Sequence, residues 1–290
     1  MTSAPAVGSL AQLGIGTTNP TAAAFEFVSC SLRKLSTLSG PEGVRGTRSR
    51  EKYKVRTVNE AVSGSIVMNP TPTELDLLLP WILGGTTSAG VTDVANALST
   101  RYVQVDKVTK VATYDEVLVS RAIFSGSQGN PIQLTLELEG KSETIGNAGS
   151  FPSLTLPTDN LFVFSGVTLT LLSTARQVES FTLTIDNSVT ADRWLNNLQR
   201  DDMAATDRIV TLDCRIPYTS DNADLHDIAV AGAAASLAWS DGTTTYTVAA
   251  ANAKAPADGP EVPGRDEIWI DLSMQLLADQ SASECKFTKS

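Results

Sequence analysis

The chain has 290 residues, of which 42% are hydrophobic, so it is long enough for one large domain or two of ordinary size with a substantial core. Its formal net charge of −10 argues against a general affinity for DNA or anionic membranes. The three cysteines, Cys30, Cys214 and Cys285, are widely spaced and odd in number. They match no disulfide framework or zinc-ligand spacing, and we expect reduced thiols.

The N-terminal segment is rich in small and polar residues, and its first basic residue is Arg33. It therefore lacks the positive start that is typical of a signal peptide. We expect residues 1–24 to form a flexible arm.

Residues 33–56 are basic, in contrast to the rest of the chain. Eight basic residues and two acidic ones give this segment a net charge of +6 and leave −16 elsewhere. Glycine, proline and serine fill its middle, which predicts two strands joined by a long, mobile loop. It could be a nucleic-acid patch, although only Tyr53 supplies an aromatic ring, or a solvated loop. We favour a loop that docks on the acidic surface of a neighbouring copy, with contact candidates Arg45, Arg48, Arg50 and Lys52.

The stretch NPTPTELDLLLPWILGG predicts a capped helix over residues 73–83. Thr71 and Glu74 have the spacing of a capping box, and Pro72 falls at the first helical position. One face is apolar at helical spacing, and we expect it to pack on a partner surface through Leu75, Leu78, Leu79 and Ile82. The apolar run is too short to span a membrane.

Four stretches alternate between apolar and polar residues and therefore predict strands: 130–140, 180–186, 208–216 and 266–276. Their polar sides carry carboxylates at Glu137, Glu139, Asp186, Asp213 and Asp271. Glu137 and Glu139 could in principle form a glycosidase pair, but a solvated strand face explains them better.

Other catalytic patterns are missing from the sequence. The one histidine, His226, has no partner histidine for a common metal site, and its surroundings do not form a triad. No P-loop, GxGxxG or GxSxG motif occurs. We therefore expect no enzyme activity and no cofactor.

The order strand, proline, polar cap, helix and glycine occurs at residues 67–85 and again at 215–232, where Leu225 and Ile228 would be the packing residues of the second helix. A Gly/Ser/Pro-rich connector lies at 146–160. We predict a mainly β chain with two tandem β-sandwich or partly closed barrel domains, 25–145 and 161–290, each with a flanking α-helix.

Three long stretches, beginning SGSIVMNPTPTELDLLLPWILGG, YVQVDKVTKVATYDEVLVSRAIFSGSQGNPIQLTLELEG and FTLTIDNSVTADRWLNNLQRDDMAATDRIVTLDCRIP, resemble the tail tube (major tail) proteins of long, flexible-tailed bacteriophages. The resemblance implies tube-type domains, whose rings stack into the hollow tail tube of the virion. It also implies synthesis in the host cytoplasm and partners that include the tape measure, tail terminator and tail-tip proteins. Two fused domains imply trimeric rings that mimic sixfold ones. DNA would pass through the lumen without specific binding.

Within this interpretation, the five carboxylates are candidates for the lumen wall, with the strands 132–139 and 268–275 as the bore-forming pair; an outer-surface position is the alternative. Trp269 lies on the polar side of its strand and is a candidate for a subunit contact. The competing function is a β-sandwich adhesin or receptor-binding module, with Trp239, Trp269 and Tyr246 as possible recognition residues.

Overall fold

The computed structural model describes residues 6–21, 23–40, 43, 46–49, 52–226, 228, 232–256, 262, 264–279 and 282–290. The prediction of a mainly β fold is confirmed. The strands are β1 (Gln12–Gly16), β2 (Ala23–Phe25), β3 (Ser29–Cys30), β4 (Arg33–Ser39), β5 (Arg56–Met68), β6 (Gly84–Ser88), β7 (Val91–Val94), β8 (Arg101–Asp106), β9 (Lys110–Ser127), β10 (Gln133–Gly140), β11 (Ser142–Asn147), β12 (Thr168–Leu171), β13 (Thr174–Arg176), β14 (Ser180–Asp186), β15 (Val189–Thr190), β16 (Ala204–Ala205), β17 (Ile209–Pro217), β18 (Ala233–Ser240), β19 (Thr245–Lys254), β20 (Trp269–Leu277) and β21 (Lys286–Lys289). The helical elements are η1 (Gly8–Leu10), η2 (Lys52–Lys54), α1 (Pro72–Leu83), η3 (Phe164–Gly166) and η4 (Ser220–His226).

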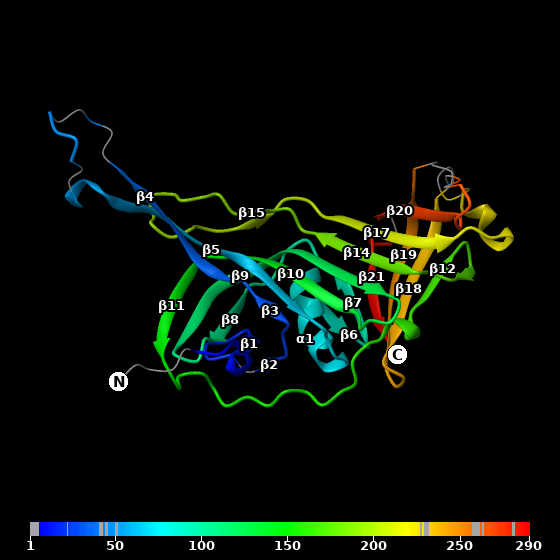
Figure 1. Cartoon of the computed structure of the whole chain (residues 1–290), viewed down its shortest axis with the longest axis horizontal. Helices are drawn as coiled ribbons and strands as arrows, with labels where there is room; N and C mark the ends of the chain where they lie inside the picture. The colour runs from blue at the N-terminus through cyan, green and yellow to red at the C-terminus, as the bar shows by residue number, and fades with distance from the viewer. Residues whose placement is uncertain are drawn as a thin grey trace.

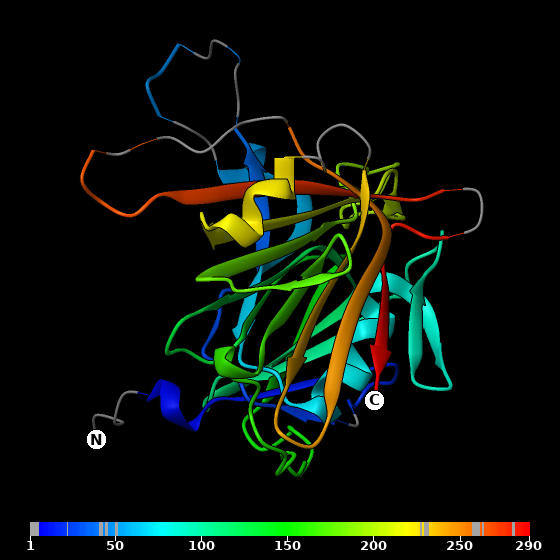
Figure 2. The same cartoon turned by 90° about the vertical axis from the view of Figure 1, so that its right-hand side faces the viewer.

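One continuous antiparallel sheet runs through both halves of the chain, in the order β4-β5-β10-β9-β14-β17-β20. We call it the long sheet. Figure 2 shows β14, β17 and β20 side by side, with β18 and β19 running across them in a second layer. Every second side chain along a strand points toward the core, as in β10, where Leu134, Leu136 and Leu138 are buried.

The two halves repeat the same pairing pattern. The paired strands of the first half are β1–β2, β1–β8, β8–β9, β9–β10, β9–β11, β4–β5 and β5–β10. The corresponding pairs in the second half are β12–β13, β12–β18, β18–β19, β19–β20, β19–β21, β14–β17 and β17–β20. β14 also pairs with β9 and β21 with β7, so the sheet and the core are shared between the halves. The boundaries proposed above stay a prediction.

The N-terminal stretch differs from the expected flexible arm. Residues 12–16 form β1, which lies between β2 and β8, and its Leu13 and Ile15 are buried. Two apolar side chains at alternate positions are enough to hold this segment in the sheet, because β8 supplies the backbone hydrogen-bond partners.

Helix α1 confirms the helix prediction. Thr71 and Glu74 form the capping box, and Gly84 ends the helix in the left-handed conformation at φ 79°. The predicted apolar face is fully buried: Leu75, Leu78, Leu79 and Ile82 are at most 1% exposed. Burial raises the pKa of the Glu74 carboxyl despite hydrogen bonds from the backbone of Thr71 and Glu26.

The second predicted helix begins as a 3₁₀ helix instead of an α-helix. In the described part of the chain, the corresponding segment is the 3₁₀ helix η4, with residue 228 helical beyond it. Leu225 and Ile228 are nevertheless buried, as expected for the packing residues. The side chain of His226 lies outside the described part.

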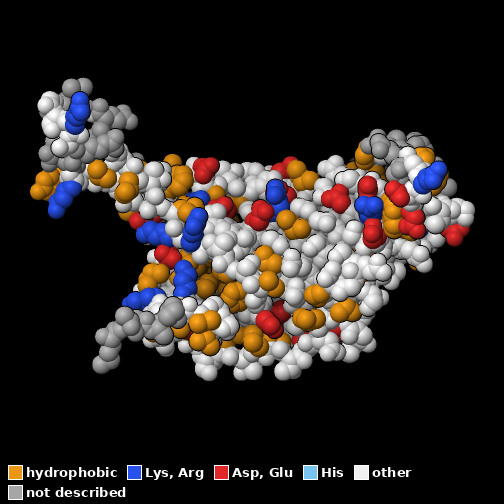
Figure 3. Space-filling view, viewed as in Figure 1, with side chains coloured by type: hydrophobic (Ala, Val, Ile, Leu, Met, Phe, Trp, Pro, Cys, Tyr) orange, Lys and Arg blue, Asp and Glu red, His pale blue; other side chains and the backbone are white. Residues whose placement is uncertain are grey.

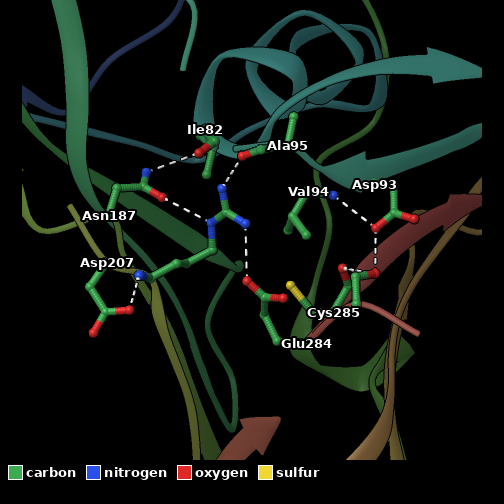
Figure 4. A network of polar contacts seen from close by, with 10 residues as sticks. Ile82, Asp93, Val94, Ala95, Asn187, Asp207, Glu284 and Cys285 are labelled. Carbon is green, nitrogen blue, oxygen red and sulfur yellow. Dashed lines mark hydrogen bonds and ion pairs between the residues drawn. The ribbon is translucent and has the colours of Figure 1, made fainter. Parts of the chain in front are cut away.

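A buried polar network joins the two halves beside helix α1 (Figure 4). Asn187, which is 1% exposed, donates to the carbonyl oxygens of Ile82 at 3.0 Å and Val119 at 3.1 Å. The Arg208 guanidinium donates to Asn187, to Glu284 at 3.0 Å and to the carbonyl of Ala95. Breaking such a network leaves buried groups unpaired, so the network holds the halves in one arrangement.

Candidate functional site

All five predicted carboxylates lie on one side of the long sheet. In the strand registers, Arg121 of β9 lies opposite Glu137 of β10 on one side and Asp186 of β14 on the other. Asp213 of β17 lies opposite Ser273 of β20. Asp271 faces Arg215, and Glu139 follows Glu137 on the same side. We call this surface the polar face. Its remaining positions are mostly hydroxyl side chains: Ser63, Ser65, Ser125, Thr135, Thr182, Thr184, Thr211 and Ser273.

The predicted bore-forming pair is not a pair of neighbours. The strand of residues 132–139 is β10 and that of 268–275 is β20, and β9, β14 and β17 lie between them. They are equivalent strands of the two repeats, since β10 pairs with β5 and β9 while β20 pairs with β17 and β19.

The carboxylates on β10 and β14 are largely neutralised by arginines. Arg121 lies 2.7 Å from Asp186 and 3.6 Å from Glu137, and Arg200 lies 2.6 Å from Glu139. Partial burial would raise the pKa of Asp186, but hydrogen bonds from Arg121 and Ser188 outweigh it and hold that pKa below its usual value.

The carboxylates on β17 and β20 are more exposed. Asp213 and Asp271 are both exposed, and Asp213 accepts a hydrogen bond from Ser273. Within the described residues no ion pair to either is recorded, because Arg215 binds Glu179 at 2.8 Å instead. The polar face therefore carries its unneutralised charge on β17 and β20.

The basic segment forms a hairpin that projects from the body (Figure 1, upper left). β10 ends opposite Val62, so the first residues of β5 extend past the sheet, and β4 pairs with them. Every residue of β4 is exposed, as are Arg48 and Lys52. Arg45 and Arg50 lie outside the described residues.

The base of this hairpin is supported by residues 187–208 of the second half. The backbone N–H of Glu60 donates to Leu198 at 2.7 Å, and the indole of Trp194 donates to the carbonyl of Glu60 at 3.0 Å. This segment joins β14 to β17 as the basic loop joins β4 to β5, so it is the equivalent loop of the second repeat. It lies along its counterpart, so the described part of the chain has one projecting basic hairpin.

Trp269 is half-buried at the start of β20. The Arg215 guanidinium carbon lies 5.1 Å from the centre of its ring, in a cation–π contact. The other two aromatic candidates are buried: Trp239 is 0% and Tyr246 1% exposed. They cannot contribute to a recognition surface, which removes the main support for an adhesin.

The family model described as phage tail tube protein matches residues 7–275. The chain belongs to the phage tail tube protein family. The match covers the first repeat of this tail tube protein, the hairpin between β4 and β5, and the second repeat as far as residue 275 in β20. No curated protein matches the sequence.

Family membership assigns the protein a structural role in the virion tail, and it favours a protein without catalytic activity. Among the described residues, no helix is both long enough and apolar enough to cross a membrane.

The sequence reasoning missed the two arginines that neutralise the carboxylates. Arg121 was detectable in principle, because it sits on the polar side of the alternating strand 110–127. Arg200 could not be assigned, since it reaches Glu139 from a loop of the other half.

Proposed function

We propose that this protein assembles into stacked rings that form the hollow tail tube, and that phage DNA passes through it along the polar face of the long sheet. The observation that carries the proposal is the gathering of polar and charged side chains on one face of a sheet that runs unbroken through both repeats. Its opposite face is the core, so the polar face must meet solvent, a neighbour or the bore.

Ring closure follows from the two edges of the long sheet. Among the described residues, β3 and β4 at one edge pair only with β5, and Trp269 to Met274 of β20 at the other edge pair only with β17. Exposed edges of this kind are templates for another chain. The pairing of β9 with β14 joins the repeats edge to edge within one chain and supports edge-to-edge pairing between copies. Three copies would then complete a pseudo-sixfold ring.

The chemistry of the polar face suits passage of DNA. Hydroxyl groups and carboxylates offer phosphates no cation to bind, and Arg121, Arg200 and Arg215 are held by carboxylates of the same chain. Because phosphate binding depends on free Lys and Arg, DNA would slide along such a wall and not adhere to it. The exposed Asp213 and Asp271 add weak repulsion over about one Debye length of 8–10 Å.

The projecting hairpin would join successive rings. Its described tip is basic and exposed, and the rest of the chain is acidic, so a second copy offers it a complementary surface. In the assembled tail, the tape measure protein would occupy the lumen, and the terminator and tail-tip proteins would bind the two ends of the tube.

Lysine substitution on the polar face tests the DNA-passage proposal. The variant Asp213→Lys with Asp271→Lys should form tubes of normal length but slow or stall DNA ejection, because its cations would bind phosphates. The matched control, Asp213→Asn with Asp271→Asn, removes the same charges without adding cations and should eject DNA normally. Normal ejection by the lysine variant in intact tails would contradict a bore position for this face.

A further inference from the structure

A groove lies at the far end of the long sheet from the basic hairpin. Its lining includes Gln128, Phe164, Arg176, Glu179, Glu267 and Trp269, and it holds about 610 Å³. These residues come from the end of β9, the loop before β12, the β13–β14 connection and the start of β20. We call it the Trp269 groove.

The registers fix the position of the groove relative to the hairpin. The hairpin extends past the sheet at the end where β10 and β14 stop and β17 begins. The Trp269 groove lies where β9 stops, β14 begins, β17 stops and β20 begins. Figure 1 shows the hairpin and β12, β17 and β20 at opposite ends of the longest axis. A contact between two such ends is heterologous, so it can repeat from one copy to the next without limit.

The charges of the two ends are complementary. In and beside the groove lie six carboxylates and three arginines: Glu179, Asp221, Asp224, Asp266, Glu267, Asp271, Arg176, Arg215 and Arg265. The described hairpin tip carries Arg48, Lys52, Lys54 and Arg56. In Figure 3, Lys and Arg side chains predominate at the left end and Asp and Glu gather at the right end.

A buried arginine supports one wall of the groove. The side chain of Arg176 is 1% exposed, and its two terminal nitrogens bind Asp221, Asn222 and Asp224. Its Nε atom has no partner within the described structure. The bonds to its terminal nitrogens hold η4 against β13, so this wall of the groove is formed within one chain.

Apolar surfaces are available at both ends. Phe164, Val178 and the half-buried Trp269 line the groove, and the hairpin exposes Tyr53 at 78% and Leu38 at 64%. An aromatic anchor in a pocket, surrounded by charged pairs, is a common arrangement at the centre of a protein interface.

We propose that the Trp269 groove receives the basic hairpin tip of a second copy in the adjacent ring. This inference rests on the proposed stacking of rings and adds the receiving surface. Glu267 is an exposed groove carboxylate, and Lys52 is an exposed cation of the tip.

A reciprocal charge exchange tests the pairing in the full chain. Glu267→Lys and Lys52→Glu should each reduce the tube length seen by electron microscopy at least tenfold, with circular dichroism unchanged. The double variant should recover at least half of the normal length. Glu26→Lys makes the same charge change outside the groove and hairpin, and should assemble normally.

Crosslinking gives a readout that does not depend on recovery. With benzoylphenylalanine at position 53, assembled tubes should give crosslinks to residues 164–179 or 267–269. Three results would overturn the groove assignment and leave the tube function standing. They are crosslinks only to residues outside these two ranges, tubes of normal length from both single variants, or no recovery of tube length in the double variant. Failure of the unaltered protein to form tubes would instead overturn the proposed function itself, and the groove assignment with it.

Discussion

The substitution Leu78→Ala tests whether α1 is a packing element of the shared core. Leu78 is 0% exposed on the buried face of the helix, and α1 packs against β6, β7 and β9. Removing a fully buried leucine side chain costs the lost transfer free energy and leaves a cavity, together about 2–5 kcal/mol. Alanine has the better helix propensity, so the loss cannot be attributed to the helix backbone.

The neighbouring residue supplies the control. Leu77 is 47% exposed on the opposite side of the helix, and Leu77→Ala should change the free energy of unfolding by less than about 0.5 kcal/mol. Equilibrium urea denaturation of the free subunit, followed by tryptophan fluorescence and circular dichroism, measures both variants. A loss below about 0.5 kcal/mol for Leu78→Ala, or equal losses for the two variants, would refute the packing role.

Three further predictions concern the hairpin, the helix end and the polar face. Arg48→Glu with Lys52→Glu should block ring stacking but leave the unfolding free energy within about 0.5 kcal/mol, since both residues are exposed; normal tubes at physiological salt would rule out electrostatic docking. Gly84→Ala should destabilise the subunit by more than about 1–2 kcal/mol, because φ is 79° and a methyl group would meet a backbone carbonyl oxygen; an unchanged urea midpoint would contradict this. The pKa of Asp186 is lower in the folded protein, beside Arg121, than the value of 3.8 expected in the unfolded chain. The ionised carboxylate therefore stabilises the fold above pH 3.8, and this stabilisation is lost as the pH falls through the folded pKa. Asp186→Asn should therefore cost up to about 1 kcal/mol near neutral pH, with the difference from the unaltered protein shrinking below pH 3.8; a difference independent of pH would argue against this pairing.

The elements that local sequence determines were predictable. The capping box of Thr71 and Glu74 and the glycine at position 84 define α1 without reference to the rest of the fold. Alternation with a period of two put Glu137, Asp186 and Asp271 on the polar sides of their strands, and pairing in register then brought those sides together.

The features that depend on contacts distant in sequence were not predictable. The pairing of β9 with β14 makes one sheet of two repeats, and nothing within either strand specifies the other as its partner. The 3₁₀ conformation of η4 occupies the start of a predicted α-helix whose polar cap was inferred from the sequence pattern alone. Arg200 neutralises Glu139 across 61 residues of sequence, so the charge of the polar face could not be derived from its strands.

Electron cryo-microscopy of tubes assembled from the purified protein tests the central claim most directly. The account predicts hollow tubes in which the polar face of the long sheet, with Asp213 and Asp271, lines the bore and the β3–β4 edge of one copy adjoins β20 of the next. Tubes with Glu137, Glu139, Asp186, Asp213 and Asp271 all on the outer wall would contradict it.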